Sequence, residues 1–397
     1  MTKRTYPLSV QPGIPRLSDL KPGWTRLPIG NLFDVVARPA NMQDDQRYRL
    51  ITVRRSRGGL DLRSEMYGRE ISVKSQFFVE SGDFLISKRQ IVHGACGLVP
   101  AELDGAIVSN EYSVLQCRDI LDPRYLAQLI HSTYLQQTFF HSSIGVHIEK
   151  MIFKLADWFK WQVNLPPLPE QRKIAEFLGA VDERIAQVTR KKALLEDYKK
   201  GCMQQLFSQS IRFKDDQGND FPDWGETTIG QQAKVTTGSR DTKDRIDCGQ
   251  FPFFVRSDTV ERINSWAMDC EAVITSGDGV GVGKNFHYIN GKFDFHQRVY
   301  AVFDFSEPLN GAFFYQFFRE KFLRRVMRLS AKNSVDSVRM SMIVDMELPL
   351  PHPDEQQKIA DFLSAIDKKI DLVAQELQQA KIFKKGLLQQ MFVGGAR

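Results

Sequence analysis

Two stretches of the chain place apolar residues at alternating steps of three and four. In residues 355–392 these positions are Ile359, Leu363, Ile366, Ile370, Val373, Leu377, Ala380, Leu387 and Met391. In residues 170–207 they are Ile174, Leu178, Val181, Ile185, Val188, Leu195, Cys202 and Leu206. Lysines interrupt the pattern at Lys192, Lys199 and Lys384. A period of about 3.5 residues is typical of a helix that packs along another helix, so the pattern predicts two long helices that each need a partner.

The two stretches are copies of one segment. Residues 170–207 match residues 355–392 without a gap, each residue lying 185 positions before its counterpart, as in Glu170/Glu355, Asp182/Asp367 and Lys199/Lys384. Prolines precede both copies, at 165–169 and 348–353, where they end one element and tolerate a helix start. A second echo pairs Pro22–Trp24 and Ile29–Gly30 with Pro222–Trp224 and Ile229–Gly230. The order along the chain is therefore globular region, helix, globular region, helix.

The two predicted helices bury both apolar seams most simply by packing against each other, antiparallel if the globular regions lie at opposite ends. Parallel packing and pairing with helices of another protein remain open. A helix of 38 residues spans about 57 Å at 1.5 Å per residue, against about 34 Å for one turn of DNA. It can therefore act as a ruler between two DNA readers, or simply as a dimerisation rod. Gly201 and Gly386, each after two lysines, are expected to mark ends or bends of the helices.

The regions before the helices predict two α+β modules with related frames and divergent contents. Short β-like runs alternate with Gly, Asp and Asn turns at 77–79, 83–86, 106–108, 112–115, 272–275, 286–289 and 299–303. Each module then passes into a helical stretch, at 123–140 and 309–329. We expect an α+β fold of two globular modules joined by two long helices in an antiparallel coiled coil, with boundaries at 1–164, 165–207, 208–347 and 348–397.

Composition is that of an ordinary globular chain of about two domains. The 397 residues are 42% hydrophobic and 26% charged, and no apolar run reaches 18 residues, so we expect no membrane span. The first residues lack the apolar stretch of a signal peptide. Five scattered cysteines without a CxxC pair argue against a zinc site or a disulfide framework. They suit a reducing compartment, and we expect a cytoplasmic protein.

Positive charge gathers in the first module. The net charge of the chain is +6, which says little alone. Between positions 47 and 74, however, only Asp61, Glu65 and Glu70 stand against the cations Arg47, Arg49, Arg54, Arg55, Arg57, Arg63, Arg69 and Lys74. Such an excess is a candidate phosphate-binding surface. Taken alone, the charge favours the simpler interpretation of a solvated basic face.

Candidate DNA-reading residues gather in predicted loops. In the first module they are Arg54, Arg55, Arg57, Lys88, Arg89, Gln90, Ser109, Asn110 and Glu111. In the second they are Arg240, Lys243, Arg256, Lys284, His296, Gln297, Arg298, Lys332 and Asn333. Arg and Lys suit guanine edges and phosphates, and Asn and Gln suit adenine. For any single residue, ordinary surface chemistry is the stronger alternative. The segment 296–298, beside a predicted strand, is the best candidate, and its alternative is a polar turn that stabilises the module.

Sequence motifs for catalysis are not found. The Gly-rich segment Ser276–Lys284 resembles a phosphate loop, but Asp278 stands where that loop needs Gly, and Asn285 stands where it needs Ser or Thr. A flexible turn near a DNA backbone or a plain β-turn fits this segment better. The chain lacks the Asn-Pro-Pro-Tyr-like or Asp-Pro-Pro-Tyr-like tetrapeptide of amino-methyltransferases, a nuclease-like carboxylate–lysine cluster, GxSxG and a spaced histidine metal motif. We therefore expect no catalytic residues, no metal and no cofactor on this chain.

The duplicated segments resemble specificity (S) subunits of type I restriction–modification enzymes. The resemblance rests on Leu165–Ala175 and Pro353–Ala360, and the segments Ser276–Lys284 and Gly291–Arg298 look like a common pattern of target recognition domains. It covers essentially the whole chain and implies that residues 1–164 and 208–347 are target recognition domains. In this family each such domain reads one half of a split double-stranded DNA site, and the helices set the spacer.

The resemblance also implies partners. Two methyltransferase subunits would dock on the helices and methylate adenine with S-adenosylmethionine, after flipping the base out of the stack. Two restriction subunits, which use ATP and Mg, can join them. Lys192 and Lys199 depart from an unbroken apolar seam and put tight packing of the middle of the rod in question.

Two other classes of function compete with this one. The chain can be a scaffold whose coiled coil is its whole function and whose modules bind proteins. It can also be an enzyme built on the Gly-rich segment, the weakest of the three. DNA recognition should weaken steeply with salt, whereas a mainly apolar assembly should not, and an enzyme of the third kind would bind nucleotide by itself.

Overall fold

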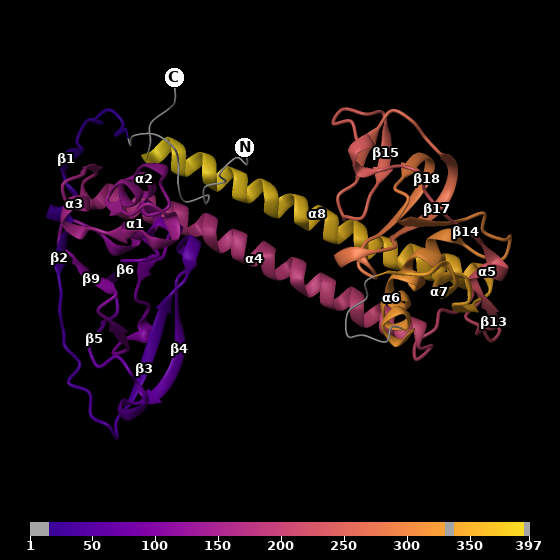
Figure 1. Cartoon of the computed structure of the whole chain (residues 1–397), viewed down its shortest axis with the longest axis horizontal. Helices are drawn as coiled ribbons and strands as arrows, with labels where there is room; N and C mark the ends of the chain where they lie inside the picture. The colour runs from indigo at the N-terminus through magenta and orange to yellow at the C-terminus, as the bar shows by residue number, and fades with distance from the viewer. Residues whose placement is uncertain (1–15, 330–336, 393–397) are drawn as a thin grey trace. The chain divides into compact units, whose positions relative to one another are not determined.

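The computed structural model describes residues 16–329 and 337–392 (Figure 1). The chain forms two compact units, Met1–Val188 with Glu376–Arg397, and Thr189–Gln375. Both units combine strands with helices, so the α+β class predicted from the sequence is correct. Each long helix contributes one part to each unit, and the two units are described separately below.

The first unit contains two four-stranded sheets. One sheet has the order β2 (Phe33–Val35), β9 (Tyr112–Cys117), β6 (Phe84–Ser87) and β7 (Cys96–Leu98). The other has the order β4 (Leu60–Tyr67), β3 (Arg47–Val53), β8 (Ile107–Ser109) and β5 (Gln76–Phe78), and only its β3–β8 pair is parallel. Figure 1 shows β3 and β4 as a long hairpin. The predicted strand runs of this module all lie in or beside these strands, whereas the hairpin was not predicted.

Two helices, α1 (Pro123–Leu129) and α2 (Thr133–His141), follow β9 in the first unit. The sequence predicted a single helical stretch here, but Ser132 interrupts it and caps α2, because its Oγ accepts a hydrogen bond from Leu135 N at 3.3 Å. The apolar side chains of α1 and α2 join the largest core of the unit together with Phe84 and Trp158, which are fully buried. The smaller elements are the pair β10 (Ser143–Ile144) and β11 (Ile152–Phe153), and the helix α3 (Leu155–Trp158).

The second unit is built on one six-stranded sheet. Its order is β14 (Lys234–Thr237), β19 (Val299–Phe303), β17 (Met268–Ser276), β18 (Phe286–Phe295), β15 (Phe251–Phe254) and β16 (Glu261–Ile263). Only β15 and β18 run parallel. Helix α6 (Gly311–Leu329) packs on β17 and β18, with Phe318 and Phe322 against Phe286 of β18. These two phenylalanines and Phe313 and Phe314 are fully buried. Two short helices, α5 (Ile229–Gln232) and α7 (Met340–Val344), complete the unit.

A two-stranded antiparallel sheet lies at the entry to each long helix. In the first unit β1 (Thr25–Pro28) pairs with β12 (Gln162–Leu165), and in the second β13 (Gly225–Thr228) pairs with β20 (Glu347–Leu350). The first strand of each pair begins just after a repeated Pro-x-Trp segment, and the second strand leads into or overlaps a repeated proline-rich segment. The repeated sequence segments therefore mark a strand pair that joins the first strand of each module to its last strand.

Each long helix contains 40 residues: α4 (Leu168–Phe207) and α8 (Pro353–Phe392). In the first unit the early part of α4 shares a core with the end of α8, through Leu178 and Phe392. In the second unit the early part of α8 shares a core with the end of α4, through Leu363 and Leu206. Gly201 and Gly386 lie inside these helices, and each helix continues beyond its glycine. Neither glycine adopts a positive φ. Of the two predicted roles, an end or a bend of the helix, the first is therefore wrong, and the second stays a prediction.

Among residues 16–329 and 337–392, no helix has the length and apolar character that crossing a membrane requires.

Candidate nucleic-acid interface and the frame that holds it

A tryptophan–glutamate contact closes each two-stranded sheet onto a long helix. In the first unit Trp24 Nε1 donates to the Glu170 carboxylate at 3.1 Å. In the second unit Trp224 Nε1 donates to Glu355 Oε2 at 3.0 Å. Glu355 also accepts hydrogen bonds from Arg212 at 2.8 and 3.1 Å and is fully buried, whereas Glu170 is half-buried. The glutamates that match in the sequence repeat therefore do the same work in both units.

A glutamine next to each glutamate ties the helix start to the module. Gln171 Oε1 accepts from Asp122 N at 2.9 Å, and Gln356 Oε1 accepts from Asn310 N at 2.9 Å. These backbone groups lie just before α1 and α6, so each module's main helix starts against a long helix. Both glutamines are fully buried, and both amides donate to the proline carbonyl five residues earlier, at 2.9 and 2.8 Å.

An aspartate further along each long helix receives two donors. Asp182 accepts from Lys384 Nζ of α8 at 2.5 Å and from Gln128 Nε2 of α1 at 3.1 Å. Asp367 accepts from Lys199 Nζ of α4 at 2.6 Å and from Gln316 Nε2 of α6 at 2.9 Å. We call these repeated Trp–Glu, Gln and Lys–Asp–Gln contacts the duplicated frame.

The lysines that interrupt the apolar pattern thus have partners. Lys199 is buried, and this burial, followed by the nearby Arg319 charge, lowers its pKa. Its ion pair with Asp367 accounts for a charge inside the seam. Lys192 instead pairs along its own helix with Glu196 at 2.5 Å.

The seam positions differ in burial. Leu178, Val188, Ile359, Leu363, Ile366 and Val373 are buried. Those that are half-buried are Ile174, Val181, Ile185, Leu195, Ile370 and Leu377. Inside the first unit, Arg184 of α4 also pairs with Glu376 of α8.

Three arginines of the second module come together on two buried carboxylates. Arg256 and Arg298 both contact Asp278, at 3.2 and 2.7 Å. Arg240 contacts Asp294 at 3.2 Å, and Asp294 also accepts from Ser265 Oγ at 2.7 Å. We call Arg240, Arg256 and Arg298 the arginine cluster.

The aspartates fix the arginine cluster in place, but its side chains remain partly exposed to solvent. Its side chains remain 43%, 47% and 63% exposed in the order Arg240, Arg256, Arg298, although their aspartate partners are 10% exposed or less. A guanidinium carries five N–H donors, which is more than the contacts with the aspartates and with Ser265 use. Anchoring by a buried carboxylate fixes the side chains in advance, which lowers the entropy cost of binding a phosphate or a guanine edge.

The segment 296–298 divides its roles. His296 is 3% exposed, and its Nδ1 accepts from Arg298 N at 3.0 Å. Burial, followed by the charge of Arg256, lowers the pKa of His296, so it stays neutral and shapes the turn. Gln297 and Arg298 are exposed. The side chain of His296 therefore stabilises the turn, and Gln297 and Arg298 remain candidates for contacting DNA bases.

The Gly-rich segment packs next to the arginine cluster. It forms a single 3-10 turn at Gly279–Gly281, and Asn285 Nδ2 donates to Arg256 O at 2.9 Å. Gly283 has a φ of 65°, and a Cβ there would meet the Leu323 side chain of α6 at 2.6 Å. The turn is thus a packing element that leaves Lys284 exposed. Lys243 is exposed in the 3-10 turn just after Arg240, while Lys332 and Asn333 lie outside the described residues.

The candidates of the first module also come together, in two adjoining turns. Lys88 Nζ donates to Asn110 O at 2.6 Å, and Arg89 pairs with Glu111 at 2.6 Å. The turn after β3 reaches the segment that follows Gln90, because Arg57 N donates to Gly94 O at 2.8 Å. Arg54 pairs with Asp61, and Arg55 with Glu149 at 3.2 Å.

Arg57 has a structural role that the sequence did not reveal. Its Nε donates to Ile130 O at the end of α1 at 2.7 Å, and burial lowers its pKa. Ser56 and Arg57 have φ angles of 56° and 57°, which non-glycine residues adopt rarely. The turn is thus bent to send this arginine inward, and we leave Arg57 out of the proposed DNA surface.

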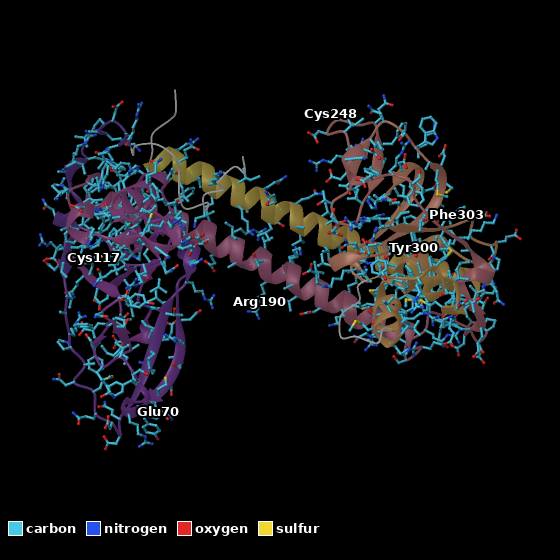
Figure 2. The ribbon with its side chains drawn as sticks, viewed as in Figure 1. Glu70, Cys117, Arg190, Cys248, Tyr300 and Phe303 are labelled. Carbon is cyan, nitrogen blue, oxygen red and sulfur yellow. The ribbon has the colours of Figure 1, made fainter. Side chains whose placement is uncertain are left out.

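Figure 2 shows the side chains of both units, with Tyr300 labelled on β19 of the second. Tyr300 Oη donates to Val338 O at 3.0 Å, beside the turn that contains Asp278.

The anchors Asp278 and Asp294 were not predicted from the sequence. The signal was weak, because neither belongs to a repeat and each meets its arginine through the sheet. Among the described residues, no group of three or more His, Cys, Asp or Glu side chains could hold a metal ion.

Comparison with known protein families also finds a duplicated chain. The family described as "Type I restriction modification DNA specificity domain" matches residues 23–197 and 222–381, which is most of the chain. The chain belongs to this family. Its two matches cover both modules and most of both long helices, so the internal repeat is a repeat of this domain.

Relatives of the specificity-subunit class cover different shares of the chain. The Escherichia coli type I restriction enzyme EcoDI specificity subunit is 30% identical over 159 residues, which is 40% of this chain and 34% of that protein. The Methanocaldococcus jannaschii MjaVIII specificity subunit is 25% identical over 332 residues, 74% of this chain and 75% of that protein. The alignment with the first relative thus spans about a third of its length.

Solved structures show the same fold over almost the whole length. The S subunit of a type I restriction–modification system from M. genitalium has a TM-score of 0.64 at 16% identity, covering 96% of this chain and 99% of that one. The subunit from Thermoanaerobacter tengcongensis has a TM-score of 0.51 at 19% identity, covering 95% and 98%. The pairing of two modules with two long helices is therefore a fold that this specificity-domain chain shares with them.

Proposed function

We propose that this chain is the DNA-specificity subunit of a type I restriction–modification complex, in which each module reads one half of a bipartite site. The duplicated frame carries the proposal. It repeats the same polar contacts in both units, while the sheets that it holds differ in strand number and order. A constant frame with two different reading surfaces suits a protein that recognises two different sequences.

The proposed DNA surface of the second module is the arginine cluster with Gln297, Lys243 and Lys284. In the first module it is Arg54, Arg55, Lys88, Arg89, Gln90 and Asn110. Clustered cations supply the phosphate contacts that give affinity, and arginine and amide side chains read base edges. The domain boundaries that we propose are 1–164, 165–207, 208–347 and 348–397.

The long helices are proposed to pair as an antiparallel coiled coil that sets the spacer. The ion pairs Asp182–Lys384 and Lys199–Asp367 support this arrangement, since each joins the early part of one helix to the late part of the other. A helix of 40 residues is about 60 Å long, which exceeds one turn of DNA. An insertion of four residues in a helix should add about 6 Å, or nearly two base pairs, to the recognised gap. An unchanged gap in a folded, active variant would exclude the ruler.

The chain itself is proposed to be non-catalytic and to bind no cofactor. Two methyltransferase subunits would dock on the helices and use S-adenosylmethionine to methylate adenine, and two restriction subunits with ATP and Mg can join. We propose that such a complex acts on double-stranded DNA in the cytoplasm.

A salt titration tests the proposal against a protein-binding scaffold. The chain is assembled with a type I methyltransferase subunit from its host, and its affinity for duplex DNA is measured by fluorescence anisotropy between 50 and 200 mM salt. With several phosphate contacts the affinity should fall by about a thousandfold or more. Binding of the subunits without measurable DNA affinity at any salt concentration would favour the scaffold.

A further inference from the structure

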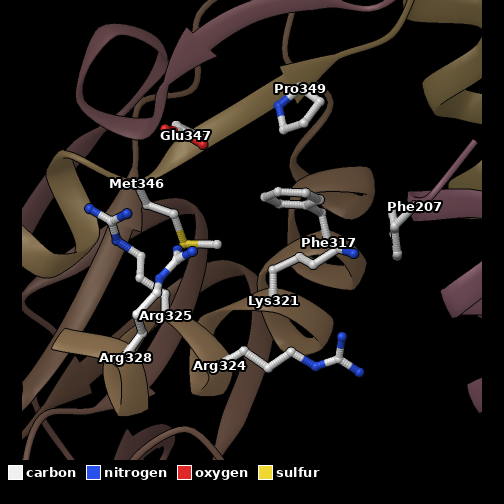
Figure 3. A pocket seen from close by; sticks show the side chains of 9 residues that line it. All are labelled: Phe207, Phe317, Lys321, Arg324, Arg325, Arg328, Met346, Glu347 and Pro349. Carbon is white, nitrogen blue, oxygen red and sulfur yellow. The ribbon is translucent and has the colours of Figure 1, made fainter. Parts of the chain in front are cut away.

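A basic hollow lies on α6 of the second unit (Figure 3), and its lining includes no residue of the arginine cluster or its anchors. Its volume is about 440 Å³. Phe207, Phe317, Met346 and Pro349 form its apolar part, and its charged lining consists of Lys321, Arg324, Arg325, Arg328 and Glu347. Four cations against one carboxylate make this hollow a positive site with an apolar floor.

The cations come from one face of one helix. Positions 321, 324, 325 and 328 follow the three- and four-residue steps that bring side chains together on a helix. Arg325 serves the fold, because it donates to Met342 O and Asp345 O at 2.8 and 2.7 Å. Arg324 is 3.7 Å from Glu320, and Lys321 and Arg328 have no ion-pair partner among the described residues. Three of the four cations are therefore available to a ligand.

The apolar residues of the hollow come from α6, from the end of α4 and from β20 with the residue before it. Phe207 is the last residue of α4, and its ring meets Phe317 edge-on at 5.6 Å. Met346 and Pro349 lie at the start of β20 and within it, on the strand that leads into α8. The hollow therefore lies where α4 ends and shortly before α8 begins, whereas Arg240, Arg256 and Arg298 lie in the turns beside β14, β15 and β19.

The first unit lacks this charge. The pairs Gln128/Gln316 and Asp122/Asn310 make the same frame contacts and lie 188 positions apart, which aligns α6 with α1 and α2. On this alignment the counterparts of Lys321, Arg324, Arg325 and Arg328 are Thr133, Gln136, Gln137 and Phe140. All of these are uncharged, although buried positions agree at Tyr134/Phe322 and Thr138/Val326.

We propose that the hollow takes an acidic segment of a protein partner, an apolar side chain flanked by carboxylates, and that this segment belongs to the methyltransferase subunit docked on the second half. This rests on the proposed function. A DNA backbone fits less well, because it would bring no apolar group to the floor and would meet the Glu347 carboxylate at the rim. The two docking sites for methyltransferase subunits are then unequal, because the hollow on α6 is positively charged and the matching positions of the first unit are uncharged.

A difference in charge between the two docking sites has a measurable consequence. Charged contacts at the edge of an interface raise the association rate and weaken with salt. Of the two methyltransferase subunits that bind one chain, one should bind with a steeper salt dependence than the other. The wild-type chain can show this by calorimetric titration with the methyltransferase subunit at 50 and 300 mM salt. Equal salt slopes for the two steps overturn the proposal.

A charge-reversed variant locates the effect. Lys321→Glu with Arg324→Glu and Arg328→Glu should weaken one of the two binding steps by about tenfold or more, so that native mass spectrometry finds one methyltransferase subunit per chain at concentrations where the wild type holds two. The conservative variant Lys321→Arg with Arg324→Lys and Arg328→Lys should keep two. The matched control Thr133→Glu with Gln136→Glu, in the first unit, should also keep two.

The remaining outcomes separate the two proposals. A charge-reversed chain that binds both subunits with unchanged affinity overturns the docking site. A chain that keeps both subunits but loses DNA affinity also overturns it and assigns the hollow to the DNA backbone. If the wild-type chain binds no methyltransferase subunit at all, the proposed function fails first. Circular dichroism melting checks that the variant is folded, and the wild-type salt slopes decide the question if it is not.

Discussion

The first unit holds two four-stranded sheets where the second holds one sheet of six strands, yet both are attached to the long helices by the same polar contacts. Tryptophan to glutamate, glutamine to the start of a module helix, and lysine to aspartate to glutamine recur in the same order. The comparison teaches that the same donor and acceptor pairs can attach different sheets to a long helix, with Gln171 and Gln356 fully buried in both units. The sheets can change because only their edges and turns would face a target.

The matched contacts are nevertheless unequal in burial, and this allows the comparison to be tested. Glu355 is fully buried and binds Arg212 as well as Trp224, whereas Glu170 is half-buried and binds Trp24. Glu355→Ala leaves Arg212 and Trp224 without their partner and should lower the free energy of unfolding by about 4 kcal/mol. Glu170→Ala should cost about 1 kcal/mol. Urea unfolding of both variants measures the difference, and equal losses would show that burial does not govern the frame.

The next difference is in pH dependence. His131 in the first unit occupies the position of Arg319 in the second, 188 residues later, and each lies near a Lys–Asp pair of the frame. Burial, and then the charges of Lys384 and Arg57, lower the pKa of His131 to about 4. The unfolded chain therefore takes up a proton on this histidine between pH 6.5 and about 4 while the folded unit does not.

The first unit should thus lose stability as the pH falls through that window, by roughly 3 kcal/mol in all at about 1.4 kcal/mol for each pKa unit. Stability above pH 6.5 is unaffected by this group. His131→Gln should flatten the pH profile, while the charge-conserving Arg319→Lys should leave it unchanged in this range. Thermal melts from pH 7 to pH 4 give the measurement, and a His131→Gln profile as steep as the wild type would contradict the assignment.

The smallest of these effects separates the two reading surfaces. Arg298→Ala should weaken DNA binding by about 2 kcal/mol, because one well-placed arginine contact is worth about 1–3 kcal/mol. The loss should fall on one half of the site only. Arg89→Ala, in the first module, should affect the other half. Binding to a panel of duplexes with each half scrambled in turn checks this, and the same half affected by both variants would mean that the two modules do not divide the site.

The sequence predicted what depends on local patterns. The helices of 40 residues followed from apolar spacing in 170–207 and 355–392, and the strands at 272–275 and 299–303 from short apolar runs between turns. Contacts between distant positions could not be predicted in this way. Gln128 and Asp182 are 54 positions apart, and nothing in either neighbourhood points to the other before the chain is folded.

The candidate site shows the same limit. Residue type and loop position located Arg256 and Arg298, but not the Asp278 carboxylate that holds both. The same criteria also selected Arg57 and His296, whose side chains turn inward. Whether a basic side chain in a turn faces solvent depends on backbone angles such as the positive φ of Arg57, which composition does not specify.

Sequencing the methylated bases of the host genome, with and without this gene, tests most directly whether two unlike modules on one frame read a split site. We expect the deletion to remove methylation from one two-part adenine motif with a gap of fixed length, and the Arg298→Ala chain to relax the specificity of one half of that motif. A genome whose methylated motifs are the same with and without the gene would contradict the proposed function.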